Sequence, residues 1–322
     1  MAGERRTEGA HAAPAKPALG LAAYGGQLRQ LLSAMRPRQW AKNLLIYLAF
    51  FFTLGQHETA GLAGELSLFG EVTLGFLLFS LLAGATYIIN DLLDLEADRL
   101  HPQKKNRPLA AGRLNPTFAV AGSVVMAAVA VGLAFILDLG FGVMSVVYLG
   151  VILAYNLQLK NMVIVDVMTV AAGFVVRAAA GALIIGAPIS PWLYVMTSLG
   201  ALLISLGKRR NERAALGESG AQHRRVLEDY SVPFLDQLVA IVAPATLVSY
   251  TLYTFTAENL PDDNSMMLTI PFVLYGIFRY LFLVHHKNMG GSPEEIFLTD
   301  YPLLINILLW LATASGILLY AR

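Results

Sequence analysis

The sequence predicts an all-α, polytopic membrane protein in which nine transmembrane helices form one bundle. Of its 322 residues, 56% are hydrophobic and only 14% are charged, with a mean hydropathy of +0.59. Soluble domains carry about 25% charged residues. The charges are concentrated in short clusters, which leaves repeated apolar runs of the ~20 residues that a helix needs to cross ~30 Å of hydrocarbon. These runs lack the alternation of barrel strands, so helices are the spanning structure that remains.

The expected spans follow directly from these apolar runs. The first has the shortest apolar core, from Leu44 to Leu54. We find no internal repeat of the kind that builds the paired halves of transporters. The nine predicted spans are residues 40–55, 73–91, 117–137, 141–157, 163–186, 191–207, 234–256, 267–284 and 301–320.

Positive charge orients the predicted bundle, because Lys and Arg accumulate in cytoplasmic connections. The connections 56–72, 138–140, 187–190 and 257–266 contain neither residue. We therefore expect a cytoplasmic N-terminus and an extracytoplasmic C-terminus. The opposite set of connections and span ends carries Arg36, Arg38, Lys42, Arg99, Lys104, Lys105, Arg107, Arg113, Lys160, Lys208, Arg209, Arg210, Arg213, Arg224, Arg225 and Lys287.

The N-terminal region differs in composition from the rest of the chain. Residues 1–24 are rich in Ala, Gly and Pro and lack the apolar core of a secretory signal peptide, so we expect a disordered cytoplasmic tail. Residues 24–35 fit a short interfacial helix, and residues 25–322 are expected to form a single transmembrane domain. The chain has no cysteine, which excludes disulfides, thiolate chemistry and cysteine-ligated metals.

An acidic motif ends the second predicted span, with Asp91, Asp94 and Asp98 following Asn90. At 100° per residue the three aspartates fall within about 60° of one another, while Glu96 points to the opposite side. Carboxylates on one face repel each other and are costly near a bilayer without partners. Mg²⁺ takes one or two carboxylates and completes its shell with water and phosphate oxygens. We therefore predict a Mg²⁺–diphosphate site here, against the alternative of a solvated acidic collar.

Cations follow this motif closely and are suited to phosphate oxygens. They include Lys104 and Arg107, and the run Arg107-Pro108-Leu109-Ala110-x-Gly112 comes directly after the aspartates. Together, Asn90-Asp91-x-x-Asp94-x-x-x-Asp98 and this run resemble the first signature of the UbiA-type intramembrane prenyltransferases. The resemblance extends from about Met35 to the end of the chain. It implies a nine-helix bundle with a cytoplasm-facing active-site cavity that binds Mg²⁺ and a diphosphate.

Three further stretches point to one branch of this superfamily. They are Arg36-Pro37-Arg38-Gln39-Trp40-Ala41-Lys42-Asn43, then Leu206-Gly207-Lys208-Arg209 with Glu212 and Tyr230-Ser231, and finally Gly290-Gly291-x-Pro293-Glu294-x-x-x-Leu298-x-Asp300. They resemble the decaprenyl-phosphate phosphoribosyltransferases. This resemblance implies a pentosyltransferase of the bacterial plasma membrane that moves 5-phosphoribose from phosphoribosyl diphosphate (PRPP) to polyprenyl (decaprenyl) phosphate. Diphosphate leaves, and the lipid-linked ribose serves arabinan synthesis in the cell wall.

The segment after the sixth span departs from the aromatic prenyltransferases, which carry a second aspartate-rich motif there. This chain has Lys208-Arg209-Arg210-Asn211-Glu212-Arg213 instead, which suits an anionic acceptor or a sugar phosphate. We favour Lys208 and Arg209 as functional, while Arg210 and Arg213 are also explained as positive-inside anchors.

Ionisable residues within the spans usually face the bundle interior and mark a site or a partner. Asp166 lies near the expected cytoplasmic mouth, and Arg177 and Arg279 lie deeper, where an ion pair and a binding role both remain open. The full set of expected substrate-binding residues is Arg36, Gln39, Lys42, Asn43, Lys104, Arg107, Tyr155, Lys160, Asp166, Arg177, Lys208, Arg209 and Glu212.

Two other functions compete with this interpretation. One is a UbiA-type enzyme that moves a prenyl group from a prenyl diphosphate to an aromatic acceptor. The other is a transporter without chemistry, which leaves the clustered aspartates unexplained. We expect membrane lipid and PRPP as partners and no nucleic acid, and we leave open homo-oligomerisation, acceptor chain length and the number of Mg²⁺ ions.

Overall fold

A computed structural model describes residues 21–54, 61–102, 104–216, 225–287, 289–291, 296–297 and 299–320. Within these ranges the regular elements are all helical, which confirms the predicted all-α class. The predicted disordered tail lies outside the described residues up to residue 20. Helix α1 (Leu21–Ala34) begins before the interfacial helix we expected, so residues 21–24 belong to a helix and not to a tail.

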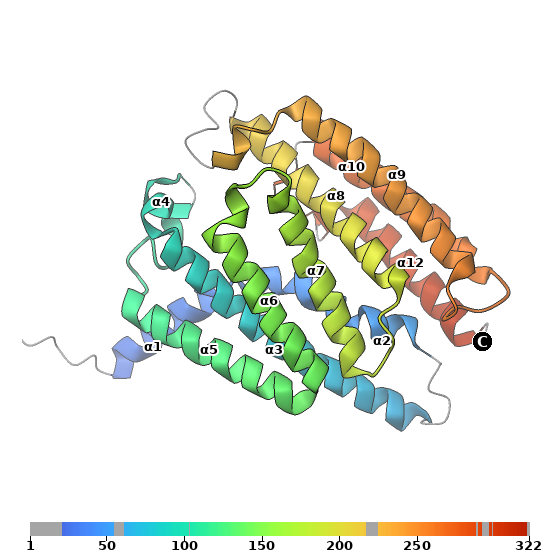
Figure 1. The fold of residues 1–322 in the computed structure, drawn as a ribbon, viewed down its shortest axis with the longest axis horizontal. Helices are drawn as coiled ribbons and strands as arrows, with labels where there is room; N and C mark the ends of the chain where they lie inside the picture. The colour runs from blue at the N-terminus through green and yellow to red at the C-terminus, as the bar shows by residue number, and fades with distance from the viewer. Residues whose placement is uncertain are drawn as a thin grey trace, which may run out of the picture.

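Seven helical segments in the described chain are long and apolar enough to cross a membrane. They correspond to the second to fifth and the seventh to ninth predicted spans and run side by side through the bundle (Figure 1). These segments are α3 (Gly61–Leu93), α5 (Pro116–Leu137), α6 (Leu139–Leu157), α7 (Val165–Ile184), α9 (Val232–Thr256), η7 (Ser265–Thr269) with α10 (Ile270–His286), and α12 (Tyr301–Tyr320).

Helix α3 is longer than the span predicted for it. Its 33 residues extend about 50 Å, well beyond the hydrocarbon thickness. It begins at Gly61, so Glu65 and Glu71 lie in the helix and not in the connection 56–72 where we expected them. The predicted connection 56–72 is therefore wrong for residues 61–72, which form the first turns of a long helix.

Helix α8 (Pro191–Leu216) contains the sixth predicted span in its N-terminal part and lies between α7 and α9. Its 26 residues are long enough to cross a membrane. Its C-terminal part carries the cationic run from Lys208 to Arg213, which lowers its overall hydropathy. It is therefore not one of the seven apolar segments.

The first predicted span, 40–55, does not form a regular α-helix. The chain forms a 3₁₀ helix, η1 (Pro37–Tyr47), followed by the five-residue α2 (Leu48–Phe52). The carbonyl of Ile46 lies so close to α7 that a Cβ on Gly181 would be only 2.0 Å from its oxygen. Backbone that departs from a regular α-helix is tolerated at membrane depth where it is packed against other parts of the protein. The segment is therefore a 3₁₀ helix and a short α-helix packed against α7, and not the regular α-helix that we expected.

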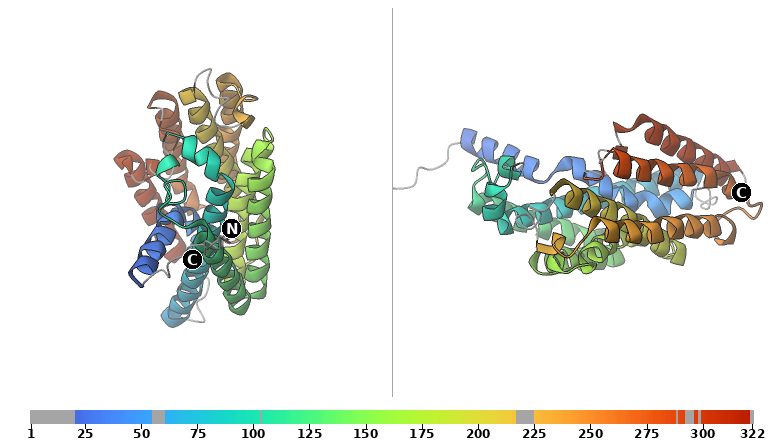
Figure 2. Two further views of the ribbon diagram at one scale, coloured as in Figure 1. Left: turned by 90° about the vertical axis from the view of Figure 1, so that its left-hand side faces the viewer. Right: turned by 90° about the horizontal axis from the view of Figure 1, so that it is seen from above.

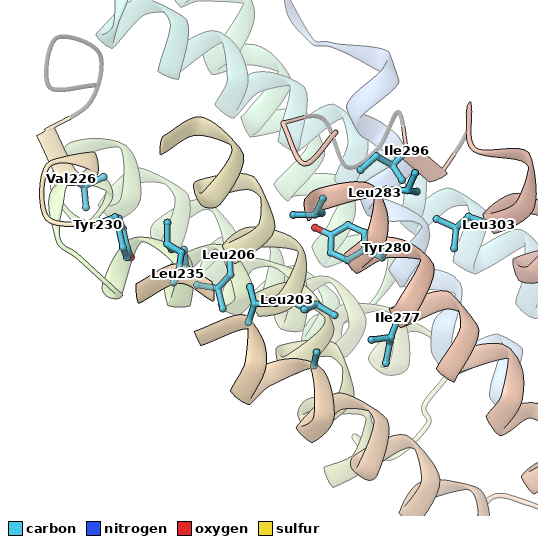
Figure 3. Packing of buried hydrophobic residues seen from close by; sticks show 14 residues of the cluster. Leu203, Leu206, Val226, Tyr230, Leu235, Ile277, Tyr280, Leu283, Ile296 and Leu303 are labelled. Atoms are coloured by element: carbon cyan, nitrogen blue, oxygen red, sulfur yellow. The ribbon is translucent and has the colours of Figure 1, made fainter. Parts of the chain in front are cut away.

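The two largest of the four buried apolar clusters in the described chain lie in different halves of the bundle. In the first half, Phe79, Phe141 and Tyr148 lie at the contacts of α3, α6 and α7. In the second half, Leu206, Leu235 and other apolar side chains join α8, α9 and α10, and the chain before α9 adds Tyr230 (Figure 3). Each half therefore has its own core, and α7 and α8 join them.

The polar motifs gather at one end of the bundle. Helix α4 (Leu95–Leu100), the α6–α7 connection with η4 (Leu159–Asn161) and the C-terminal end of α8 lie toward the upper left of Figure 1. The views in Figure 2 place α1 near this end and the end of α12 at the other. The positively charged segments of the sequence therefore meet in space.

Candidate active site

The aspartate motif forms where α3 passes into α4. A turn at Asp94 separates the two helices, yet the amides of Asp94 and Asp98 still donate to the carbonyls four residues earlier, at 2.9 and 2.8 Å. Helical phase is therefore kept across the turn, and Asp91 and Asp98 lie two turns apart on one side. Both are almost fully buried. Glu96 points away and pairs with Arg99 at 2.9 Å, as its phase predicts.

Three cations from three separate segments of the chain contact these aspartates. Arg107 Nη1 donates to Asp91 Oδ1 at 3.1 Å and to Asp98 Oδ2 at 2.5 Å. Arg36 pairs with Asp91 and lies over the ring of Tyr87. Lys160 Nζ, from η4, lies 2.8 Å from Asp94 Oδ1.

The structure thus brings Arg36, Arg107 and Lys160, which we predicted to bind substrate, directly to the aspartates. All three remain partly exposed, with 28%, 23% and 17% of their side chains accessible. This exposure leaves them within reach of a ligand.

The carboxylates divide into a pair and a single group. Within the described residues, no three His, Cys, Asp or Glu side chains converge as a complete metal site. Asp91 and Asp98 nevertheless flank one cationic atom, Arg107 Nη1, and hard oxygen ligands arranged around a cation fit Mg²⁺. Asp94 faces Lys160 instead. Asn90 is half-buried beside the motif, and its carbonyl accepts the amide of Asp94.

Other predicted residues lie deeper in the bundle. Asn43 is buried in η1, where it donates to Ser80 Oγ at 2.9 Å and accepts from Arg177 Nε at 2.8 Å. The Arg177 guanidinium also donates to the Gly173 carbonyl and to Tyr148 Oη, each at 2.9 Å. These contacts hold η1 against α6 and α7. In the described part of the chain no carboxylate pairs with Arg177, so the expected alternative of an ion pair is not seen there.

The remaining residues expected near the aspartates are less tightly placed. Lys42 donates to the side-chain oxygen of Gln39, and both precede the buried part of η1. The amide of Lys104 donates to His101 Nδ1 at 3.3 Å, and Lys104 is half-buried. These residues lie on the flanking segments that carry Arg36 and Arg107.

A second charged group joins α6, α7 and α8. Asp166 is fully buried and accepts from Arg209 Nε at 2.6 Å and from Tyr230 Oη at 2.7 Å. Arg209 also donates to Glu212 at 2.5 Å and to Tyr155 Oη at 3.2 Å. We predicted Asp166, Arg209, Glu212 and Tyr155 as substrate-binding residues, and the structure brings them together. Lys208, next along α8, is half-buried.

Tyr230 completes this group, and our sequence reasoning did not assign it a role in the site. The only signal was its place in a stretch that resembles the phosphoribosyltransferases, because a single tyrosine in a connection has no periodic pattern. Burial and the hydrogen bond to Asp166 raise the pKa of the Tyr230 phenol well above its usual range, burial being the larger cause. The hydroxyl is therefore a stable donor at neutral pH.

The C-terminal motif also acquires partners. Asp300 accepts from Arg279 Nε at 3.0 Å and Nη2 at 2.8 Å, and it caps α12 through the amide of Leu303. The hydrogen bond from Arg279 lowers the pKa of Asp300. We had left open an ion pair or a binding role for Arg279, and the structure shows the ion pair. A Cβ on Gly290 would lie 2.7 Å from the carbonyl of Gly207, so this motif lies against α8 beside Lys208. Pro293, Glu294 and Leu298 lie outside the described residues.

Comparison with known proteins gives these motifs a family. The UbiA prenyltransferase family model matches residues 44–207. The decaprenyl-phosphate phosphoribosyltransferase of Mycobacterium tuberculosis is 34% identical over 286 residues, covering 89% of this chain and 93% of that protein. The protein of the same name from Mycolicibacterium smegmatis is 32% identical over 303 residues, with 90% and 93% covered.

Solved structures agree on the fold. A UbiA homologue from Archaeoglobus fulgidus, bound to GPP and Mg²⁺, superposes with a TM-score of 0.69 at 20% identity, covering 90% of this chain and 99% of that one. Three observations therefore point to the same family. They are the helical architecture, the aspartate motif and the relatives that match about nine-tenths of the chain. The chain is a multi-pass membrane protein that belongs to the UbiA prenyltransferase family, in its decaprenyl-phosphate phosphoribosyltransferase branch.

Proposed function

We propose that this protein transfers 5-phosphoribose from PRPP to a polyprenyl phosphate and releases diphosphate. The relatives named for this activity match about nine-tenths of the chain. The observation that carries the proposal is the aspartate motif, in which the buried Asp91 and Asp98 and the partly exposed Asp94 are contacted by three partly exposed cations. Its carboxylates can hold a metal ion and its cations can donate to phosphate oxygens, so the site suits a metal–diphosphate group.

The chemistry asks little of a general base, because the acceptor phosphate oxygen is already anionic at neutral pH. The difficult event is departure of diphosphate from C1 of the ribose, as positive charge grows on the ring. Mg²⁺, when bound, neutralises charge on the diphosphate oxygens. We expect Asp91 and Asp98 to hold this ion, with Asp94 nearby. Arg36, Arg107 and Lys160 would then donate to phosphate oxygens and stabilise the leaving group.

The substrates also fit the proposed topology. We infer nine crossings, by counting α8 and the combined η1–α2 segment with the seven apolar segments. In this arrangement the N-terminus is cytoplasmic, the C-terminus is extracytoplasmic and the membrane is the bacterial plasma membrane. The charged end of the bundle then faces the cytosol, where PRPP is dissolved, and the acceptor's tail stays in the bilayer. Residues 25–322 would act as one domain around the aspartate site.

A transfer assay tests the proposal. Purified protein in detergent is incubated with Mg²⁺, PRPP labelled in the ribose, and polyprenyl phosphate, and label in the lipid phase is measured. We expect Mg²⁺-dependent lipid-linked phosphoribose. Absence of this product, together with transfer from a prenyl diphosphate to an aromatic acid, would instead support the other UbiA-type reaction. Absence of both products, with transport in vesicles, would support a transporter.

A further inference from the structure

The α6–α7 connection places Lys160 against Asp94, and its backbone is strained. Ile164 has φ 69° and ψ −47°, and the amide of Val165 donates to the carbonyl of Val163 at 2.8 Å. This is a γ-turn of the rare form with positive φ at its centre. A β-branched residue in this region persists only where its surroundings hold it. The turn therefore needs a restraint from another part of the protein.

Tyr230 supplies that restraint. Its hydroxyl accepts the Ile164 amide at 2.7 Å and donates its own proton to Asp166 Oδ1 at 2.7 Å. Arg209 holds the other oxygen of Asp166, which leaves Tyr230 as the donor to Oδ1. The ring is 1% exposed and lies within the apolar cluster of Figure 3, close to Val226 and Leu235. The hydroxyl is thus fixed by groups from α7 and α8 and by its own packing.

We propose that Tyr230 is a positioning residue, whose hydroxyl holds the strained turn at Ile164 and thereby keeps Lys160 against Asp94. The inference rests on the proposed function, in which Lys160 donates to the diphosphate of the donor. Tyr230 acts through the connection, since it is buried and its hydroxyl bonds to Ile164 and Asp166 and not to Asp91, Asp94 or Asp98. The cationic end of α8 therefore supports the aspartate motif mechanically, through Arg209, Asp166 and Tyr230.

The variant Tyr230→Phe tests this role, because it keeps the ring and its stacking on Phe234 and removes only the hydroxyl. We expect kcat for phosphoribosyl transfer to fall about 10-fold to 100-fold, as for small misplacements of a catalytic group. Lys160→Gln should lower kcat similarly, and Tyr230→Phe should add little in that background. Tyr280→Phe is the matched control, since Tyr280 is buried in the same cluster and its hydroxyl makes a 3.4 Å contact with the Ile204 carbonyl. Its kcat should stay within about twofold.

A rescue separates positioning from a general loss of structure. Glycine adopts positive φ without strain, so Ile164→Gly should restore most of the activity lost in Tyr230→Phe. The Ile164 side chain is 42% exposed, so this change removes little packing. Additive losses with Lys160→Gln, or no rescue by Ile164→Gly, would overturn the inference.

Hydrogen exchange tests the restraint independently of any activity. Amides of residues 158–165 should exchange faster in Tyr230→Phe than in the wild type or in Tyr280→Phe. If wild-type protein transfers no phosphoribose, the proposed function fails while this measurement still tests the restraint. Unchanged exchange in a folded Tyr230→Phe protein would overturn the restraint itself. If Tyr230→Phe does not fold alone, the Tyr230→Phe, Ile164→Gly double variant is compared with the wild type instead. Its amides at residues 158–165 should exchange at close to the wild-type rate. Faster exchange there, or failure of the double variant to fold, would overturn the inference.

Discussion

Two groups of carboxylates and cations lie at the same end of the bundle, and they differ in exposure. In the aspartate site (Asp91, Asp94 and Asp98 with Arg36, Arg107 and Lys160), the cations keep between 17% and 28% of their side-chain surface. In the α7–α8 network (Asp166, Arg209, Glu212, Tyr155 and Tyr230), Arg209 keeps 5% and Asp166 none. The first group can exchange partners with a ligand, whereas the second is held in place.

The energetics of the two groups follow from this difference. In the aspartate site Asp91 and Asp98 are buried, but their cationic partners are partly exposed, so water can solvate a cation that loses its carboxylate and the cost in stability is small. Removing one partner of a buried pair leaves an uncompensated charge and costs about 3–5 kcal/mol. Substitutions in the aspartate site should therefore change catalysis more than stability. Substitutions in the α7–α8 network should do the reverse.

The largest effect is expected for Asp91→Asn. This change removes a carboxylate that flanks Arg107 Nη1, so transfer should fall by about 10³-fold or more if it holds the metal–diphosphate group. The melting temperature in detergent should stay close to that of the wild type. Glu96→Gln is the matched control, because Glu96 lies on the same short stretch but points to solvent. Wild-type turnover of Asp91→Asn at saturating Mg²⁺ would exclude this carboxylate from the mechanism.

A large loss of stability is expected for Asp166→Asn. Arg209 would keep its charge and lose the carboxylate at 2.6 Å, which should cost about 3–5 kcal/mol of unfolding free energy. Thermal unfolding in detergent measures this effect. A protein as stable as the wild type, with a raised KM for PRPP, would show that the α7–α8 network binds the donor directly.

A smaller loss of stability is expected for Gly181→Ala. The new methyl group would meet the carbonyl oxygen of Ile46 at 2.0 Å, so η1 must move, at a cost of about 1–3 kcal/mol. Gly132→Ala in α5 is the control, because a Cβ there meets nothing within 4 Å. Equal melting temperatures for the two variants would contradict the close packing of η1 on α7.

The smallest effect is expected for Arg99→Gln. Arg99 pairs with Glu96 on the exposed side of α4, and such pairs contribute less than about 1 kcal/mol. Stability and transfer should both match the wild type. A kinetic defect comparable with that of Arg107→Gln would show that the functional surface extends beyond the aspartate site.

Several features could be predicted from the sequence because they depend on local pattern. Seven of the nine spans predicted from apolar runs match segments that are long and apolar enough to cross a membrane. Helical phase placed Asp91 and Asp98 together, with Glu96 on the opposite side. Charge patterning also indicated that the cationic segments would meet at one end. These properties depend on residues close together in the chain.

Other features depend on contacts between distant segments. The span expected at 40–55 became a 3₁₀ helix because its backbone lies against Gly181, more than a hundred residues away along the chain. Arg209 looked like a substrate-binding cation, but its burial with Asp166 cannot be seen from charge alone. Tyr230 was noted only as part of a resembling stretch, because its role in the site depends on the strained backbone at Ile164. Local pattern contains none of this information.

The most direct test of the central claim is equilibrium binding of labelled PRPP to purified protein, with and without Mg²⁺. The proposed site predicts Mg²⁺-dependent binding in the wild type and in Glu96→Gln, and loss of that binding in Asp98→Asn. Equal, Mg²⁺-independent binding by the wild type and Asp98→Asn would contradict a metal–diphosphate site at the aspartate motif.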